Sequence, residues 1–353
     1  MSQDLGVVAR TDVEGMLAAT MLAVEGRELT GRDLLAAGVV SGGWQRLERE
    51  LSEGLGLLAA QTPPRADISK EVHAFRFERR LLSAEDMRAW LHPRGLVMSD
   101  VNGVAARQVA RRRGGGAPDA VTAAEVAAAL PAEAICTGAA RDLGWWLADR
   151  LLSTKATATS VEPIAPEDPR IMRLAVAEAR TVAGARSTEP APDRAERLAW
   201  IAALDDAHRQ WETSVTGTRE VARRLREREL DWCGFALDEL RLTSPGAAAE
   251  AARQLAEGRD AQQVAATAGV SITDHRVVLA DAAPLLARVL VGAVVGDVAG
   301  PWSDDGDQVV ARVRERRPPD EEDQPLLARA RAELLSEAAE RLRAGKVRWH
   351  DRA

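Results

Sequence analysis

The stretch FALDELRL, residues 235–242, decides the fold of the last third of the chain. Its residues fall into two alternating sets, and a period of two is typical of a β-strand. The sets are Phe235, Leu237, Glu239 and Arg241, and Ala236, Asp238, Leu240 and Leu242. The sequence Ser244-Pro245-Gly246 follows, with an N-cap residue and a proline at the first helical position. The stretch therefore predicts a strand that leads directly into a helix.

The pattern continues beyond this strand. Two helices are predicted over residues 247–257 and 260–268, because each stretch ends at a glycine. A strand-like segment at 277–279, a helix at 282–290, the segment 296–302 as a further strand, and a strand at 308–313 after the turn 304–307 complete the region. The predicted order is strand, two helices, strand, helix, strand, strand. A helix over 325–344 closes the chain, with acidic residues before it and basic residues at its end, as the helix dipole favours.

The sequence before residue 230 reads as helical. In residues 1–113 we expect only helices, around a short turn at 25–30. A glycine-rich linker follows at 114–118, and a long helix over 193–228 should break near Thr216-Gly217-Thr218. The other helices predicted here cover 44–61, 70–82, 84–91, 99–113, 123–130 and 139–152, with Ser83 and Thr122 as N-caps.

Composition excludes several classes of protein. The 353 residues include 47 Lys and Arg against 54 Asp and Glu, a net charge of −7 that argues against nucleic-acid or membrane-surface binding. Cys136 and Cys233 are the only cysteines, which excludes a disulfide scaffold and a multi-cysteine metal site. The N-terminus shows no signal-peptide pattern, and the apolar run 289–295 is too short to span a bilayer. We expect a cytoplasmic protein without cofactor or metal.

The last third resembles the parvulin (PpiC-type) peptidyl-prolyl isomerase domain. The strand ELRLTS (239–244) and the helix AAEAARQLAEG (248–258) are similar to the family's first strand and a helix that ends in Leu-x-x-Gly. The stretch DAQQVA (260–265) resembles Phe-x-x-Leu-Ala, and GDVAGP (296–301) resembles Gly-x-Val-Ser-x-Pro. Residues 306–313 resemble the family's closing strand.

The remaining chain resembles folding factors. Its helical regions and terminal helix are similar in layout to SurA-like and trigger-factor-like proteins, and residues 77–96 resemble proteins of peptide-maturation systems. The implied fold is α+β and mostly helical. It comprises N-terminal (1–113) and middle (114–229) helical regions, a small parvulin-like antiparallel-sheet domain (230–319), and a C-terminal helix (320–353) that packs back on the helical body.

The departures from the parvulin pattern bear on activity. An active parvulin has one histidine on its first strand and one on its last, but here Glu239 (or Asp238) and Gln308 (or Val309) occupy those positions. The Gly-Asp-Leu-Gly-type loop has no counterpart, and His275 lies at no matching position. Parvulin catalysis uses a shaped apolar pocket to lower a barrier of roughly 18–20 kcal/mol. The resemblance therefore implies a fold that binds peptide without efficient isomerase activity.

The resulting hypothesis is a peptide-binding chaperone or accessory protein in natural-product peptide maturation. Its partners would be a polypeptide or precursor-peptide client and other maturation enzymes. The expected peptide-binding side chains are Trp232, Phe235, Leu240, Leu279, Trp302 and Val310. An alternative is an enzyme, either an active isomerase or a peptide-modifying enzyme, whose catalytic residues would be Asp238, Glu239, His275 and Gln308. A structural scaffold is a third alternative.

Overall fold

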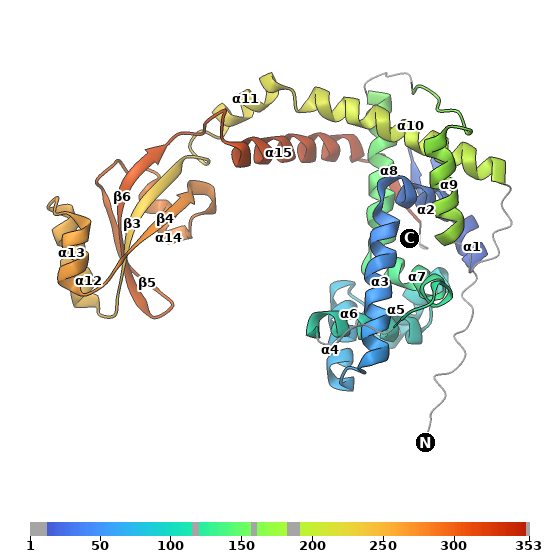
Figure 1. Cartoon of the computed structure of the whole chain (residues 1–353), viewed down its shortest axis with the longest axis horizontal. Coiled ribbons are helices and arrows are strands. Elements are labelled where there is room, and N and C mark those ends of the chain that lie inside the picture. The colour runs from blue at the N-terminus through green and yellow to red at the C-terminus, as the bar shows by residue number, and fades with distance from the viewer. Residues whose placement is uncertain (1–12, 115–119, 157–160, 182–190, 351–353) are drawn as a thin grey trace. The chain divides into compact units, whose positions relative to one another are not determined.

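The chain forms two compact units. The computed structural model describes residues 13–114, 120–156, 161–181 and 191–350 (Figure 1). Unit 1 comprises Met1–Glu212 and Ala339–Ala353, and unit 2 comprises Thr213–Ala338. Residues 115–118 of the predicted linker, and residues 1–12, in which the sequence shows no signal-peptide pattern, lie outside the described residues. Each unit has its own hydrophobic clusters.

Unit 1 is mainly helical, as predicted. Most helices of residues 31–156 begin or end within a few residues of the predicted positions, and Ser83 and Thr122 are the N-caps expected from the sequence. The predicted break near residue 217 separates α10 from α11. The helices are α1 (Val13–Ala18), α2 (Gly31–Ser41), α3 (Gly43–Ala60), α4 (Arg65–Glu78), α5 (Ala84–Leu91), α6 (Met98–Arg113), α7 (Ala123–Thr137), α8 (Ala139–Ala156), α9 (Pro169–Thr181) and α10 (Ala191–Val215), with a 3-10 turn, His92–Arg94.

The prediction of helices alone in residues 1–113 is wrong. Strands β1 (Thr20–Val24) and β2 (Arg27–Thr30) form an antiparallel hairpin, and β7 (Val347–Trp349) pairs with the other edge of β1. The turn between β1 and β2 was expected, and both Glu25 and Gly26 have positive φ there. Four residues of β1 are buried in succession, so the strand lacks the alternation that identifies a half-buried strand in sequence.

Unit 2 confirms the predicted α+β class. The observed order after α11 (Thr218–Glu227) is β3 (Gly234–Leu242), α12 (Pro245–Ala256), α13 (Ala261–Ala268), β4 (Ile272–Val278), a 3-10 turn (Leu279–Asp281), α14 (Pro284–Leu290), β5 (Val298–Asp304), β6 (Asp307–Arg317) and the start of α15 (Gln324–Arg343). The four strands form an antiparallel sheet in the order β4-β3-β6-β5. This is the predicted succession of strands and helices.

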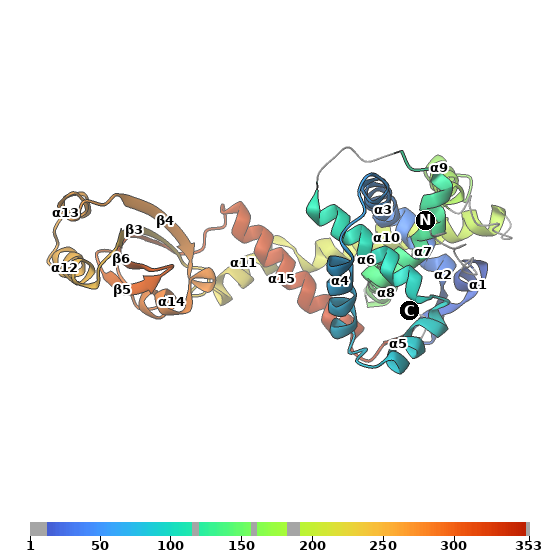
Figure 2. The ribbon, with the colours of Figure 1, turned by 90° about the horizontal axis from the view of Figure 1, so that it is seen from below.

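Helices cover both faces of this sheet. In Figure 1, α12 and α13 lie on one side of the strands and α14 on the other. The first face buries Leu240, Leu242 and Val310 against α12 and α13, and the second buries Phe235 and Leu237 against α14. Figure 2 shows α11 beside α15, and Trp232 is buried in the cluster that these two helices share. The two alternating sets of β3 residues thus contribute to two separate hydrophobic cores, one on each face of the sheet.

Candidate functional site

A polar centre lies on the α14 side of the sheet. The Nδ1 atom of His275 on β4 is 2.7 Å from Oε2 of Glu239 on β3, and the Glu239 side chain is only 5% exposed. Glu239 is paired with Thr273 in the ladder, and His275, two residues further on, lies on the same face. The strand register therefore brings together two of the residues predicted as catalytic.

An arginine neutralises the second carboxylate oxygen of Glu239. Arg241, two residues along β3, places Nε 2.9 Å from Glu239 Oε1, and its Nη2 donates to Asp304 at 2.7 Å. The hydrogen bond to Asp304 and the charge of Glu239 raise the pKa of Arg241 above its ordinary value, so it stays protonated. Both oxygens of Glu239 thus have cationic or hydrogen-bonding partners. The arrangement orients the half-exposed imidazole of His275.

The other two predicted catalytic residues lie elsewhere. Asp238 is on the opposite face of β3 and forms ion pairs with Arg312 and Arg314, at 3.2 and 3.3 Å. Gln308 is paired in register with Leu242, whereas Val309 is paired with Arg241, so Gln308 lies on the face opposite Glu239. Its Nε2 donates to Ser303 Oγ at 2.7 Å. The structure does not bring Asp238 or Gln308 together with Glu239 and His275.

Most of the side chains predicted to bind peptide are core residues. Trp302 is only partly buried, against the cluster beneath α14. The other five are buried in three different clusters: Trp232, Phe235, Leu240, Leu279 and Val310. A peptide that binds folded unit 2 would therefore contact exposed side chains and not these five buried ones.

Apart from Leu230, the exposed large apolar side chains in the described part of unit 2 lie on α14 and the turn after it. Val295 is 62% exposed and Leu285 58%, and a typical soluble surface carries few such neighbours. The set is Leu285, Val289, Val291, Val294 and Val295. The sequence signal is the nearly continuous apolar run 285–295, of which only residues 289–295 were considered from sequence, as too short to span a bilayer. Leu286, Leu290 and Ala293 of the same run are buried, so its two sides differ.

Strand β4 is an open edge of the sheet. It pairs with β3 on one side, and no described strand pairs with its other side. The N–H of Leu279 donates to Cys233 O at 3.0 Å, and hydrogen-bonded and non-bonded pairs alternate along an antiparallel ladder. The ladder bonds of β4 therefore belong to Val277, His275 and Thr273. The main-chain N–H groups of the alternate residues, Asp274, Arg276 and Val278, point away from β3.

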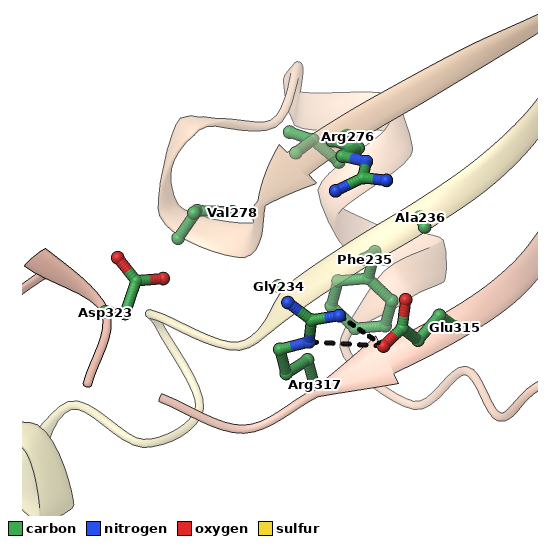
Figure 3. Close-up of a pocket in the computed structure, with 9 residues that line it drawn as sticks. Gly234, Phe235, Ala236, Arg276, Val278, Glu315, Arg317 and Asp323 are labelled. Carbon is green, nitrogen blue, oxygen red and sulfur yellow. Dashed lines mark hydrogen bonds and ion pairs between the residues drawn. The ribbon is translucent and has the colours of Figure 1, made fainter. Parts of the chain in front are cut away.

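Beside this edge the sheet is hollowed (Figure 3). A cavity of about 250 Å³ lies over the small residues Gly234 and Ala236 of β3. Its walls are paired residues of the flanking strands: Arg276 and Val278 on β4, and Glu315 and Arg317 on β6. Arg317 Nη2 donates to Glu315 at 2.7 Å, which neutralises one wall. The hollow has room for a side chain placed beside β4.

Comparisons with known proteins identify no family. No protein-family model matches the chain, and no curated protein matches it in sequence. The chain has a likeness to a solved structure described with PEB4 and the periplasmic protein Cj1289, two SurA-like chaperones of Campylobacter jejuni. The identity is 9% and the TM-score 0.18, with 94% of this chain and 99% of that chain covered.

The described residues contain neither a membrane-spanning helix nor a cluster of metal-ligating side chains. No helix among them has both the length and the apolar character needed to cross a bilayer. Within the same residues, no three His, Cys, Asp or Glu side chains are grouped so as to hold a metal ion.

Proposed function

We propose that this protein is a SurA-like, peptide-binding chaperone or accessory protein that holds an extended polypeptide without efficient prolyl isomerisation. The observation that carries the proposal is the open edge of β4, whose outward main-chain groups suit the addition of a peptide strand. The resemblance of residues 77–96 to peptide-maturation proteins favours a precursor peptide as the client.

A peptide strand on β4 would place its side chains on both sides of the sheet. Residues beside Arg276 and Val278 would reach the hollow over Gly234 and Ala236. The alternate residues would lie on the side of His275, where α14 covers part of the sheet. Main-chain bonds would supply affinity that depends little on client sequence, as a chaperone requires.

The polar centre supports binding rather than isomerisation. A prolyl amide loses its double-bond character as it twists, and an apolar, shaped pocket favours that state. Here Glu239, Arg241, His275 and Asp304 place a chain of charged and hydrogen-bonded groups on the face where the resemblance locates a catalytic histidine.

Two substitutions of one residue test the strand-addition mechanism. Arg276→Pro removes an outward N–H without breaking a bond to β3, and β-conformation at His275 is compatible with a following proline. A fluorescein-labelled Val-Thr repeat peptide, followed by anisotropy, should bind Arg276→Pro about tenfold more weakly, since a lost hydrogen bond is worth about 1 kcal/mol or more.

Arg276→Ala is the matched control. It removes the guanidinium but keeps the N–H, so peptide affinity should change by less than about threefold, the effect of an exposed charge. Equal losses in both variants would assign the binding to the side chain and refute strand addition. Unchanged binding in Arg276→Pro would place the client elsewhere.

One observation favours an enzyme as the second candidate. The Glu239–His275 pair, at 2.7 Å, is an oriented imidazole of the kind used in general base catalysis. Under this alternative the protein would accelerate proline isomerisation in a model peptide or modify its client. Acceleration that disappears in both His275→Ala and Glu239→Gln would establish the enzyme and overturn the binding-only proposal, whereas a background rate in the unaltered protein excludes the isomerase.

A further inference from the structure

The open edge of β4 is complementary in charge to a second copy of itself. Asp274, His275 and Arg276 lie at the middle of this strand, so an acidic and a basic residue flank its central histidine. If two copies of β4 run antiparallel about a twofold axis at His275, each Asp274 lies directly opposite the Arg276 of the second copy. The same register pairs the first residue of the strand with its last, so all 7 residues have a partner.

The main-chain groups of β4 fit this register. Its outward N–H groups belong to Asp274, Arg276 and Val278. In the register centred on His275, each of these residues is opposite a residue whose main-chain groups also point outward, so ladder hydrogen bonds can form. A shift by one residue would set them against groups that already bond to β3. The geometry of the edge therefore permits this register and excludes its immediate neighbours.

Charge excludes the next registers on either side. A shift by two residues in one direction would place Asp274 opposite Asp274, and in the other direction Arg276 opposite Arg276. Like charges directly opposite each other destabilise an antiparallel pair. Charged side chains on an edge strand usually discourage pairing with other chains. On β4 they discourage the shifted registers and favour the one centred on His275.

Both charged side chains can reach a second copy. The Arg276 side chain is 70% exposed, and its Nε lies 3.5 Å from Asp274 Oδ2 of the same chain, which is longer than an ordinary hydrogen bond. Asp274 is 49% exposed, and its Oδ1 accepts a hydrogen bond from Arg314 at 2.6 Å. Arg314 thus orients the carboxylate of Asp274, whose Oδ2 faces only a loose intrachain contact among the described residues.

We propose that two copies of this protein associate through their β4 edges, antiparallel and in the register centred on His275. A contact made by one short strand from each copy is small, so the dimer dissociates readily. A regulatory role of the dimer rests on the proposed function, because the second copy occupies the edge to which a client peptide would add. The protein then covers its own open edge until a client displaces the second copy.

Charge variants of the full chain test the pairing by analytical ultracentrifugation. Asp274→Arg and Arg276→Asp each place like charges opposite one another, so either variant alone should associate at least about tenfold more weakly. An equimolar mixture of the two restores both pairs of opposite charge and should associate like the unaltered protein, which also shows that both variants are folded. Arg288→Asp makes the same charge change at an exposed residue of α14 and should leave association within about twofold.

An intermolecular disulfide tests the register. His275 would face itself across the axis in a non-hydrogen-bonded pair, with Cα atoms about 4.5 Å apart, which suits a disulfide. His275→Cys should therefore form a covalent dimer with oxidised glutathione. Thr273→Cys, on the same face of β4, should not, because its two copies would lie about 13 Å apart. The native Cys136 and Cys233 are both buried.

The outcomes separate this inference from the proposed function. A protein that stays monomeric while the labelled Val-Thr peptide binds would overturn the dimer and leave strand addition by a client intact. Association of Arg276→Asp alone as strong as that of the mixture would refute the charge pairing, and stronger cross-linking of Thr273→Cys than of His275→Cys would refute the register. A dimer that the Val-Thr peptide does not dissociate would support the pairing of two copies but overturn its regulatory role.

Discussion

Arg107 and Glu133 form an ion pair within the helical core of unit 1. The Nε and Nη2 atoms of Arg107 both donate to Glu133 Oε2, at 2.9 and 2.8 Å. The side chains are 8% and 1% exposed. Gly54 and Gly103 leave space for Arg107, since a Cβ at either position would lie 3.2 Å from one of its atoms. The surrounding helices thus pack around the buried guanidinium of Arg107, whose charge is balanced by the carboxylate of Glu133.

Removal of one partner should destabilise unit 1 strongly. Glu133→Gln leaves the Arg107 charge buried without its carboxylate, and we expect the free energy of unfolding to fall by about 3–5 kcal/mol. Urea denaturation followed by circular dichroism measures this loss. The double variant Arg107→Met, Glu133→Leu should recover most of the stability. A loss below about 1 kcal/mol in Glu133→Gln would show that the pair is dispensable.

His208 makes unit 1 sensitive to acid. Its side chain is buried beside Ser153, whose Oγ is 2.8 Å from Nδ1, and Glu212, whose Oε1 is 3.2 Å from Nε2. Burial, and then the charge of Arg150, lower the pKa of His208 from its ordinary value of 6.5 to about 4. Asp205 opposes this shift, and Arg209 adds to it.

The sign of the pH effect follows from this pKa. Between pH 6.5 and 4 the unfolded chain binds a proton at His208 that the folded chain does not, so stability falls as the pH falls through this range. Urea midpoints at pH 7.5 and 5 should show a smaller difference in His208→Gln than in the unaltered protein. An identical pH dependence in both proteins would exclude His208 as the cause.

At the scale of elements, β7 depends on one small residue of α8. A Cβ at Gly144 would lie 2.3 Å from Cη2 and 3.0 Å from Cζ3 of Trp349, so a side chain there requires Trp349 to move. Trp349 also contacts the ring of Trp145 edge-on, with centroids 5.4 Å apart. Strand β7 can therefore pack against α8 only because residue 144 has no side chain.

Gly144→Ala should displace β7. We expect a loss of about 1–3 kcal/mol in unfolding free energy, typical of overpacking, despite the higher helix propensity of alanine. Hydrogen exchange should increase at Ala23 and Glu25, whose main-chain N–H groups point toward β7 and the residue before it. Gly246→Ala, also within a helix (α12) and with no atom within 4 Å of the added Cβ, is the comparison. Unchanged exchange in Gly144→Ala would contradict this account.

The elements differ in how far sequence could predict them. In β3 the two faces contact two cores, and its alternation identified the strand within one residue of its observed start. In β1 the buried residues follow one another, and β7 has three residues and a partner more than three hundred positions earlier, so local pattern identified neither. A pairing between two segments that are distant in sequence leaves no pattern of hydrophobic residues within either segment that would predict it.

The same limit applied to the candidate site. Glu239 and His275 were both named from the sequence, but their 2.7 Å contact depends on the register of β3 against β4. Asp238 is the alternative to Glu239 at the position of the first parvulin histidine, but successive strand residues face opposite ways. The peptide-binding residues were chosen as apolar side chains of the sheet, and burial by the helices that cover it removed most of them from the surface.

At the scale of the whole molecule, unit 2 is one continuous segment with its own cores. We expect a fragment of residues 213–338 to fold alone, because it contains every residue of the four-stranded sheet and of the clusters on its two faces. Far-ultraviolet circular dichroism and a cooperative thermal transition would establish this. A fragment without a cooperative transition would show that unit 2 needs unit 1.

The position of β7 has a consequence for synthesis of the protein. Unit 1 is made from both ends of the chain, and β1 receives its second neighbour only from residues 347–349. On the ribosome, unit 2 is therefore complete while the edge of β1 is still unpaired. The unit that is begun first is finished last, and an exposed, apolar strand must be kept from other chains until translation has passed Trp349.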